Sequence, residues 1–360
     1  MQQASTVRSA LLRGLRSRSP LVLAVAALLT VGVLAGLQWF VSSGRFTVLP
    51  ERLALRIPND DYVNLSYRIA EIKRHPPAGR VAYLFGGSGT MEMVRSPDAL
   101  AAAIVTAGGP RVTVISLAAH NQSIGETLAV IDNLPRGSGL LAIGLSPNRL
   151  LTAPSVDATQ ITGSPLALTS TRLAAALVGH AKVHHSLPGL LPGVFDFAVS
   201  YADQRIITKS PHLSPITYAS HYHTGDAVAS LSAKLSGSPV ELARERPLYA
   251  ANAAYNLALL VDVVRLGREK GYTVTFFEQP LDLVASGAAW NAYLKAYRAD
   301  VATVARRLAV PDIDVERQAN LHESDFYDMF HLIDSGRDKW TPPFARGLAG
   351  VLLSTGGVTP

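Results

Sequence analysis

The chain of 360 residues contains no cysteine. This absence excludes disulfides, thiolate metal sites and a cysteine nucleophile, and it leaves the redox compartment open. Charged residues are also scarce, at 17%, whereas 48% of the residues are hydrophobic. A disordered chain has the opposite balance. Length and composition together predict a folded, enzyme-sized body of one large domain or two small ones.

Acidic residues are missing from the first 50 positions, although this segment contains five arginines. The formal net charge of the whole chain is +6, and leaving out these arginines reduces it to +1 for the remainder. A nearly neutral body lacks the basic surface that binds nucleic acid. We therefore expect no DNA or RNA partner.

Leu21–Phe40 is an apolar stretch of 20 residues without a charge. As a helix it would span roughly 30 Å, the thickness of the hydrocarbon core of a membrane. Four arginines precede the run and only Arg45 follows closely, so the positive-inside rule places the N-terminus in the cytoplasm. We expect a cytoplasmic basic arm over 1–20, a single-pass anchor in the cytoplasmic membrane over 21–43, and an extracytoplasmic remainder.

A cleaved signal peptide is the alternative interpretation of this segment. Its apolar region would normally have about 7 to 15 residues, followed by small residues at the cleavage site. Here the run is longer, and Trp39 and Phe40 end it, as in the aromatic belt of a membrane interface. These features favour the uncleaved anchor.

Apolar strands and capped helices alternate beyond residue 79. This order predicts an α/β fold, a three-layer sandwich with a central, mostly parallel sheet, whose site lies at the C-terminal ends of the strands. We expect a stalk over 44–78 and one domain over 79–360, with an insertion at about 150–239 where the alternation stops. The predicted strands are 80–85, 111–117, 140–145, 272–277 and 312–315, and the predicted helices are 96–108, 123–133, 241–270, 288–308 and 343–353.

Ser88 lies between Gly87 and Gly89, directly after the first predicted strand. Glycines at this place allow a sharp turn, expose the hydroxyl and free backbone N–H groups for an oxyanion. Such a fragment alone is more often an ordinary turn. A nucleophilic role for Ser88 therefore depends on a base elsewhere in the chain.

A histidine with an acid three residues before it lies near the C-terminus. Asp328 at this spacing can contact Nδ1 of His331 and orient the opposite nitrogen towards a nucleophile. Asp325 and Asp334 flank the same histidine, but neither has the Asp-x-x-His spacing. An ion pair on the face of a helix is the alternative interpretation.

Together, the two fragments resemble the SGNH, or GDSL-like, hydrolase family, in which a serine loop after the first strand is completed by a late Asp-x-x-His. The resemblance implies that Ser88 is the nucleophile, His331 the general base and Asp328 its orienting acid. The layout is most similar to the membrane-anchored branch that includes the D-alanyl transfer protein of teichoic acids and the SGNH domains of exopolysaccharide O-acetyltransferases.

The blocks that supply the oxyanion hole depart from the family pattern. Gly87 replaces the usual aspartate before the serine, and no glycine follows the second predicted strand. The expected donors are the backbone N–H groups of Ser88 and Gly89 and one side-chain amide. Asn121 and Asn148 are rivals for that last position, and Asn121 is preferred because it directly follows the second strand.

The resemblance implies an extracytoplasmic serine acyltransferase or esterase that acts on O-acyl groups of a cell-envelope polysaccharide or related polymer. It implies no cofactor, and a multi-span membrane acyltransferase as a partner. A lipase or esterase of small esters is one alternative, and a catalytically inactive scaffold that binds glycan or the membrane enzyme is another. The acyl group, the acceptor and the choice between hydrolysis and transfer stay open.

Histidines and tyrosines gather in the predicted insertion. His221 and His223 would share one face of a strand and could form a metal pair, but a solvated or substrate-lining loop is the favoured interpretation, so we expect no metal. Glu92 is interpreted as a charge in the first turn of a helix. The other residues considered are His184 and His185, and Tyr201, Tyr218 and Tyr222 as surfaces on which sugars could stack.

Overall fold

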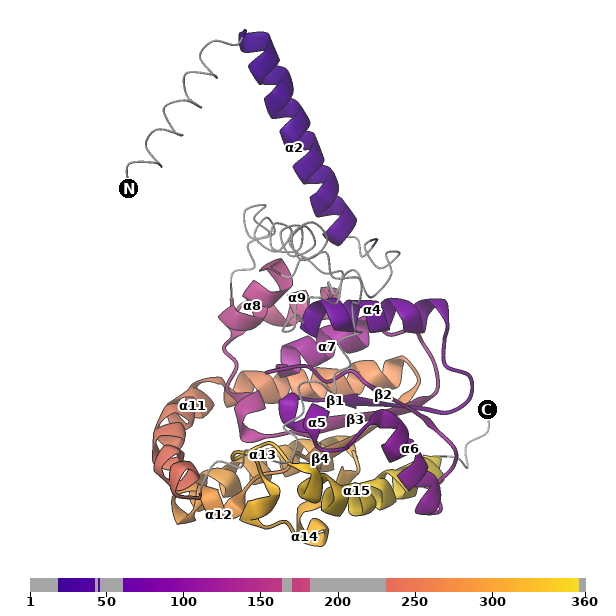
Figure 1. The fold of residues 1–360 in the computed structure, drawn as a ribbon, viewed down its shortest axis with the longest axis vertical. Helices are drawn as coiled ribbons and strands as arrows, with labels where there is room; N and C mark the ends of the chain where they lie inside the picture. Colours follow the sequence, from indigo (N-terminus) through magenta and orange to yellow (C-terminus); the bar gives the residue numbers. More distant parts are fainter. Residues whose placement is uncertain (1–18, 43–44, 46–60, 164–169, 182–230, 356–360) are drawn as a thin grey trace.

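The computed structural model describes residues 19–42, 45, 61–163, 170–181 and 231–355 (Figure 1). Its centre is a sheet of five parallel strands in the order β2-β1-β3-β4-β5. The predicted α/β class with a parallel sheet is therefore confirmed. The strands are β1 (Val81–Phe85), β2 (Thr113–Ser116), β3 (Gly139–Leu145), β4 (Tyr272–Glu278) and β5 (Asp312–Ile313).

Both faces of the sheet are covered, which explains why β1 and β3 are continuous apolar runs instead of alternating ones. Val81, Tyr83 and Phe85 of β1 belong to one hydrophobic cluster, and Ala82 and Leu84 belong to the other. Successive residues of a strand point to opposite faces, so each strand contributes to two cores.

Helices from distant parts of the chain pack on each face (Figure 1). One cluster contains residues of α4 (Asp61–Arg74), α7 (Ile124–Asn133), α9 (Thr171–Leu177), α11 (Leu231–Glu269) and α13 (Asn291–Leu308). The other contains residues of α6 (Pro97–Thr106) and α15 (Asp334–Thr355). The remaining described elements are α2 (Pro20–Ser42), α5 (Ser88–Glu92), η2 (Pro147–Leu150), α8 (Pro154–Gly163), α12 (Leu283–Ser286), η5 (Ala288–Trp290), α14 (Glu316–Ala319) and η6 (Glu323–Asp325).

Three predicted boundaries are corrected. Residues 61–74, placed in the stalk, form α4 instead and bury Leu65, Ile69 and Ile72 in the core. The predicted insertion already contains α8, α9 and the start of α11, which continues through two prolines. The last helix begins at residue 334 and not at 343, and Pro342 and Pro343 lie inside it.

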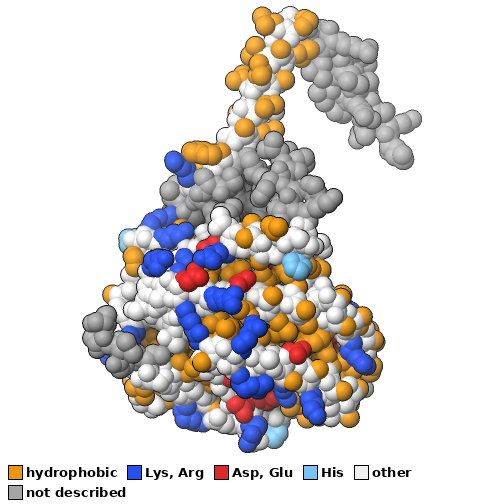
Figure 2. Space-filling view, turned by 180° about the vertical axis from the view of Figure 1, so that it is seen from behind, with side chains coloured by type: hydrophobic (Ala, Val, Ile, Leu, Met, Phe, Trp, Pro, Cys, Tyr) orange, Lys and Arg blue, Asp and Glu red, His pale blue; other side chains and the backbone are white. Residues whose placement is uncertain are grey.

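The N-terminal apolar run is a helix, α2, whose apolar side chains are exposed along its length (Figure 2). Among the described helices, the one that is long and apolar enough to cross a membrane is Gly237–Glu269, half buried within the domain, as is typical of a core helix. The described apolar part of α2 is shorter, Pro20–Gly36. A membrane span in α2 therefore stays a prediction.

Candidate active site

Ser88 is the first residue of α5, at the C-terminal edge of the sheet. The chain leaves β1 through Gly86, whose φ of +156° lies in a region that side chains rarely adopt. A Cβ at Gly86 would also lie 2.0 Å from Oγ1 of Thr90. Glycine at this position therefore allows the turn that presents the serine hydroxyl above the sheet.

The structure brings Ser88, His331 and Asp328 into one hydrogen-bonded chain. Nε2 of His331 lies 2.8 Å from Oγ of Ser88. Nδ1 of the same ring lies 2.7 Å from Oδ2 and 2.9 Å from Oδ1 of Asp328. This order of hydroxyl, imidazole and carboxylate is the geometry of a serine nucleophile with its general base and orienting acid.

Asp328 and His331 lie in a tight loop and not on a helix face, so the alternative of a helical ion pair is wrong. A β-bridge between Phe326 and Leu332 closes the loop, and the N–H of Tyr327 donates to the carbonyl of His331 at 2.8 Å. Oδ1 of Asp328 accepts the N–H groups of the two residues at positions 330 and 331, at 2.8 and 2.9 Å. These bonds hold the carboxylate of Asp328 in contact with Nδ1 of His331.

The electrostatics of the pair follow from this contact. Burial alone would raise the pKa of Asp328, but the hydrogen bond and charge of His331 and two backbone N–H groups outweigh it and lower that pKa below its usual value. Burial alone would lower the pKa of His331, but the hydrogen bond and charge of Asp328 outweigh it and raise that pKa above 6.5. The pair is thus arranged to stabilise an imidazolium when the serine loses its proton.

The rival acids have other partners. Asp325 accepts hydrogen bonds from the N–H of His322, Oγ of Ser335 and Nζ of Lys339, at 2.8, 2.8 and 2.7 Å. Asp334 bonds to Nη1 of Arg337 at 2.7 Å. Asp328 is therefore the acid that contacts His331, as the Asp-x-x-His spacing predicts.

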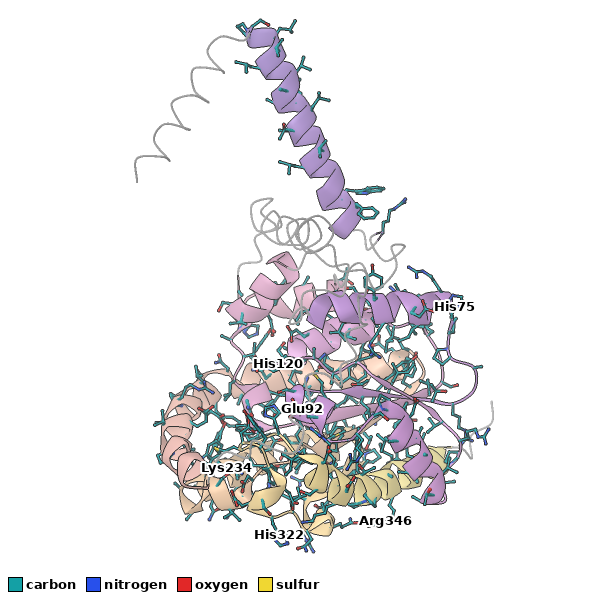
Figure 3. All side chains as sticks on the ribbon, viewed as in Figure 1. His75, Glu92, His120, Lys234, His322 and Arg346 are labelled. Carbon is teal, nitrogen blue, oxygen red and sulfur yellow. The ribbon has the colours of Figure 1, made fainter. Side chains whose placement is uncertain are left out.

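Glu92 differs from its prediction as a first-turn charge, because it ends α5 and is buried (Figure 3). Its carboxylate lies 3.7 Å from Nη2 of the buried Arg337, and the backbone carbonyl of Glu92 accepts Nε of the same arginine at 2.7 Å. The pair ties the helix of the serine to the start of α15, which directly follows the histidine loop.

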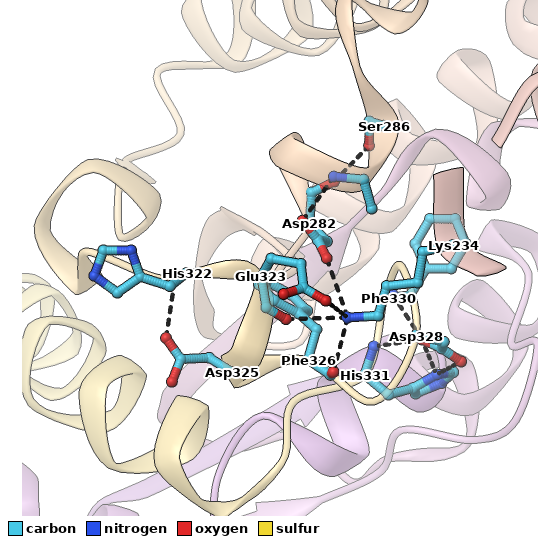
Figure 4. Close-up of polar contacts among 11 residues, drawn as sticks. Lys234, Asp282, Ser286, His322, Glu323, Asp325, Phe326, Asp328, Phe330 and His331 are labelled. Atoms are coloured by element: carbon cyan, nitrogen blue, oxygen red, sulfur yellow. Dashed lines mark hydrogen bonds and ion pairs between the residues drawn. The ribbon is translucent and has the colours of Figure 1, made fainter. Parts of the chain in front are cut away.

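A buried lysine, Lys234, contacts the start of the histidine loop (Figure 4). Nζ of Lys234 donates to the carbonyls of Phe326 and Glu323 at 2.9 and 3.0 Å, and it lies 3.4 Å from the carboxylate of Asp282. The N–H of Asp282 in turn donates to the carbonyl of Met329 at 2.9 Å. Lys234 could not be identified from the sequence, because no local motif marks a lone lysine whose partners are about 50 and 90 residues away.

Replacing Lys234 by methionine should lower the free energy of unfolding by about 3 kcal/mol or more, because the change removes the cation beside the buried carboxylate of Asp282 and the donor to two carbonyls. Thermal unfolding of the full chain in mild detergent, followed by near-UV circular dichroism, measures the effect. Lys295→Met changes an exposed lysine of α13 and is the control. Equal melting temperatures for the two variants would contradict this assignment.

A cleft of about 320 Å³ opens over the serine. All four predicted oxyanion residues line it, which are Ser88, Gly89, Asn121 and Asn148. The backbone N–H groups of the first two donate to no acceptor within the described parts of the chain, as is usual in the first turn of a helix. Both asparagines are exposed to the cleft, so its shape does not choose between them. The other lining residues are Gly87, His120, Gln122, Ser146, Arg149, Thr152, Glu241, Arg244, Gln279, Phe330 and His331.

Two further polar residues of the cleft were missed by sequence analysis. Gln279 follows β4, is buried, and donates through Nε2 to Oγ1 of Thr90 at 2.8 Å. Arg149, in η2, is also buried. A larger cavity, of about 620 Å³, lies where β4 and β5 end and contains none of the predicted site residues.

No group of three or more metal-ligating side chains occurs within the described ranges. The four histidines and three tyrosines considered in the insertion lie outside those ranges: His184, His185, His221, His223, Tyr201, Tyr218 and Tyr222. No protein-family model matches the chain, and no curated protein matches it.

Proposed function

We propose that the protein is a serine acyltransferase or esterase that uses Ser88, His331 and Asp328. The observation that carries this proposal is the continuous contact from the serine hydroxyl through the imidazole to the carboxylate. In the first step, Nε2 of His331 accepts the hydroxyl proton while Oγ of Ser88 bonds to the acyl carbon. The imidazolium then returns the proton to the leaving oxygen, and an acyl-serine ester remains.

In the second step the same imidazole removes a proton from water or from an acceptor hydroxyl. The oxygen of that molecule bonds to the acyl carbon, the ester bond to Oγ breaks, and the proton passes back to Ser88. Water gives hydrolysis and a sugar or polyol hydroxyl gives transfer. The N–H groups of Ser88 and Gly89, with the amide of Asn121 or Asn148, are the donors proposed for the negative charge that develops on the acyl oxygen.

The proposed substrate is an O-acylated polysaccharide or related polymer of the cell envelope. The lining of the cleft supports a hydrophilic substrate over a lipid, because Phe330 is its one large apolar side chain among the described residues. The exposed apolar face of α2 supports an anchor that holds the domain on the outer side of the cytoplasmic membrane. A multi-span membrane acyltransferase is the proposed partner and acyl source.

Replacing Ser88 by alanine in the native host should reduce the O-acyl ester content of the envelope polymer, because the acyl-enzyme could no longer form. Saponification of isolated envelope and quantification of the released acid measure this content. Ser354→Ala, at an exposed position near the end of α15, is the matched control. Unchanged acylation in the Ser88→Ala strain would contradict the proposed substrate.

The pH dependence follows from the raised pKa of His331. Because the neutral imidazole is the base, activity should be low where the ring is protonated and should rise with pH through an inflection above 6.5. In Asp328→Asn the inflection should move to lower pH, because the carboxylate that raises the pKa is gone. The pH profile of kcat/KM for an activated acetyl ester measures both, and an inflection that does not move would contradict the coupling.

A further inference from the structure

Arg149 lies in η2 directly after β3, and it is 4% exposed while lining the cleft of Ser88. Its guanidinium donates to three backbone carbonyls. Nε reaches the carbonyl of Gln122 at 2.9 Å, Nη1 that of Gly144 at 2.5 Å, and Nη2 that of Ser123 at 3.0 Å. Nη2 also donates to Oγ1 of Thr127. A single side chain therefore joins the segment after β2 to the end of β3.

These two segments carry the rival oxyanion donors. Asn121 precedes the Gln122 carbonyl that Arg149 binds, and Asn148 precedes Arg149 itself. β2 and β3 are not paired with each other, because β1 lies between them. Arg149 thus bridges the segments across the end of β1, where the chain turns towards Ser88.

Gln122 extends this bridge to the nucleophile. Its side-chain oxygen accepts the N–H of Gly86 at 3.1 Å, two residues before Ser88, while its Nε2 donates to the carbonyl of Leu117 at 2.9 Å. Arg149 bonds to the backbone of Gln122, and the side chain of Gln122 bonds to the serine loop. The segments that follow β1, β2 and β3 beside the cleft are therefore connected by hydrogen bonds.

The carboxylate of Glu126 acts on the buried guanidinium of Arg149 as an opposite charge. The acceptors of the hydrogen bonds of Arg149 are three carbonyls and a hydroxyl. Burial lowers the pKa of Arg149 to about 10, so the group remains a cation at neutral pH.

We propose that Arg149 is the positioning residue of the oxyanion site, which fixes the segments of Asn121 and Asn148 relative to Ser88. This inference rests on the proposed serine chemistry. Replacing an arginine with a purely structural role would change only the folded fraction. Replacing a positioning arginine changes kcat of the folded molecules, and it also changes how much kcat falls when the oxyanion asparagine is replaced.

The test uses the full chain in detergent and an activated acetyl ester as the probe. Arg149→Lys keeps the charge, but one ammonium cannot span four acceptors in the fixed directions of a guanidinium. We expect kcat per folded molecule to fall by about 10 to 100-fold with little change in KM, because the loss falls on the transition state. Arg298→Lys changes a half-buried arginine that pairs with Glu278 and Glu316, outside the cleft, and should leave kcat unchanged.

A double-mutant cycle makes the assignment specific. One of the two changes, Asn121→Ala or Asn148→Ala, should lower kcat by about 10² to 10³-fold in the wild-type background, as expected for the loss of one oxyanion donor. In the Arg149→Lys background the same change should cost tenfold less, because the donor is already displaced. If Arg149→Lys does not fold, Thr127→Val removes one acceptor of the guanidinium and should show the same pattern with a smaller loss.

The outcomes separate the two proposals. If the wild-type protein is active and Arg149→Lys has the same kcat, the role of Arg149 is overturned and the proposed function stands. Fully additive losses in the cycle would have the same meaning. A wild-type protein with no ester hydrolysis and no acylation of Ser88 would overturn the proposed function, and the role of Arg149 with it.

Discussion

Ser88→Ala should lower kcat/KM for an activated acetyl ester by at least about a thousandfold, and His331→Ala should do the same, because each removes one half of the proton transfer that activates the nucleophile. The double variant should be no slower than either single variant, since the two groups act as one unit. Initial rates of ester hydrolysis by the full chain in detergent measure these losses.

The matched controls are Ser354→Ala and His75→Ala. Both change exposed residues, the second at the end of α4 (Figure 3). Their rates should equal the wild-type rate. Independent, multiplying losses in the Ser88→Ala, His331→Ala double variant would contradict a shared proton transfer, even if each single variant were slow.

Asp328→Asn should lower kcat by about 10³ to 10⁴-fold, because the amide favours the wrong tautomer of His331 and no longer stabilises the imidazolium. Asp325→Asn is the sharpest comparison, because this acid lies three residues earlier and bonds to the N–H of His322, to Ser335 and to Lys339 instead. It should lower the melting temperature and leave kcat of the folded protein nearly unchanged.

Paired measurements of kcat and melting temperature on the two variants decide the assignment. Losses of rate that are equal in Asp328→Asn and Asp325→Asn would show that the rate depends on the integrity of the loop and not on one carboxylate. Such a result would contradict the orienting role of Asp328.

The sequence was sufficient where the relevant interactions are local. The turn at Gly86–Gly89 and the Asp328-x-x-His331 spacing each lie within a few residues, and the structure shows both of them. The alternation of apolar strands and capped helices was enough to predict the parallel sheet. Local patterns therefore located both halves of the candidate site.

Features that depend on distant partners could not be predicted in this way. Lys234, Arg149 and Gln279 are single polar residues whose roles depend on carbonyls and side chains that only folding brings near. The helices α11 and α15 contain internal prolines, which normally indicate a helix start or end. Tertiary packing of their apolar faces outweighs that local signal.

The most direct test of the central claim is intact-protein mass spectrometry of the full chain after incubation with a fluorophosphonate, followed by peptide mapping. One adduct that maps to Ser88 and disappears in His331→Ala is the predicted result, since the reaction needs both the hydroxyl and its base. An unlabelled wild-type protein, or labelling of Ser88 that persists without His331, would contradict an activated serine at this site.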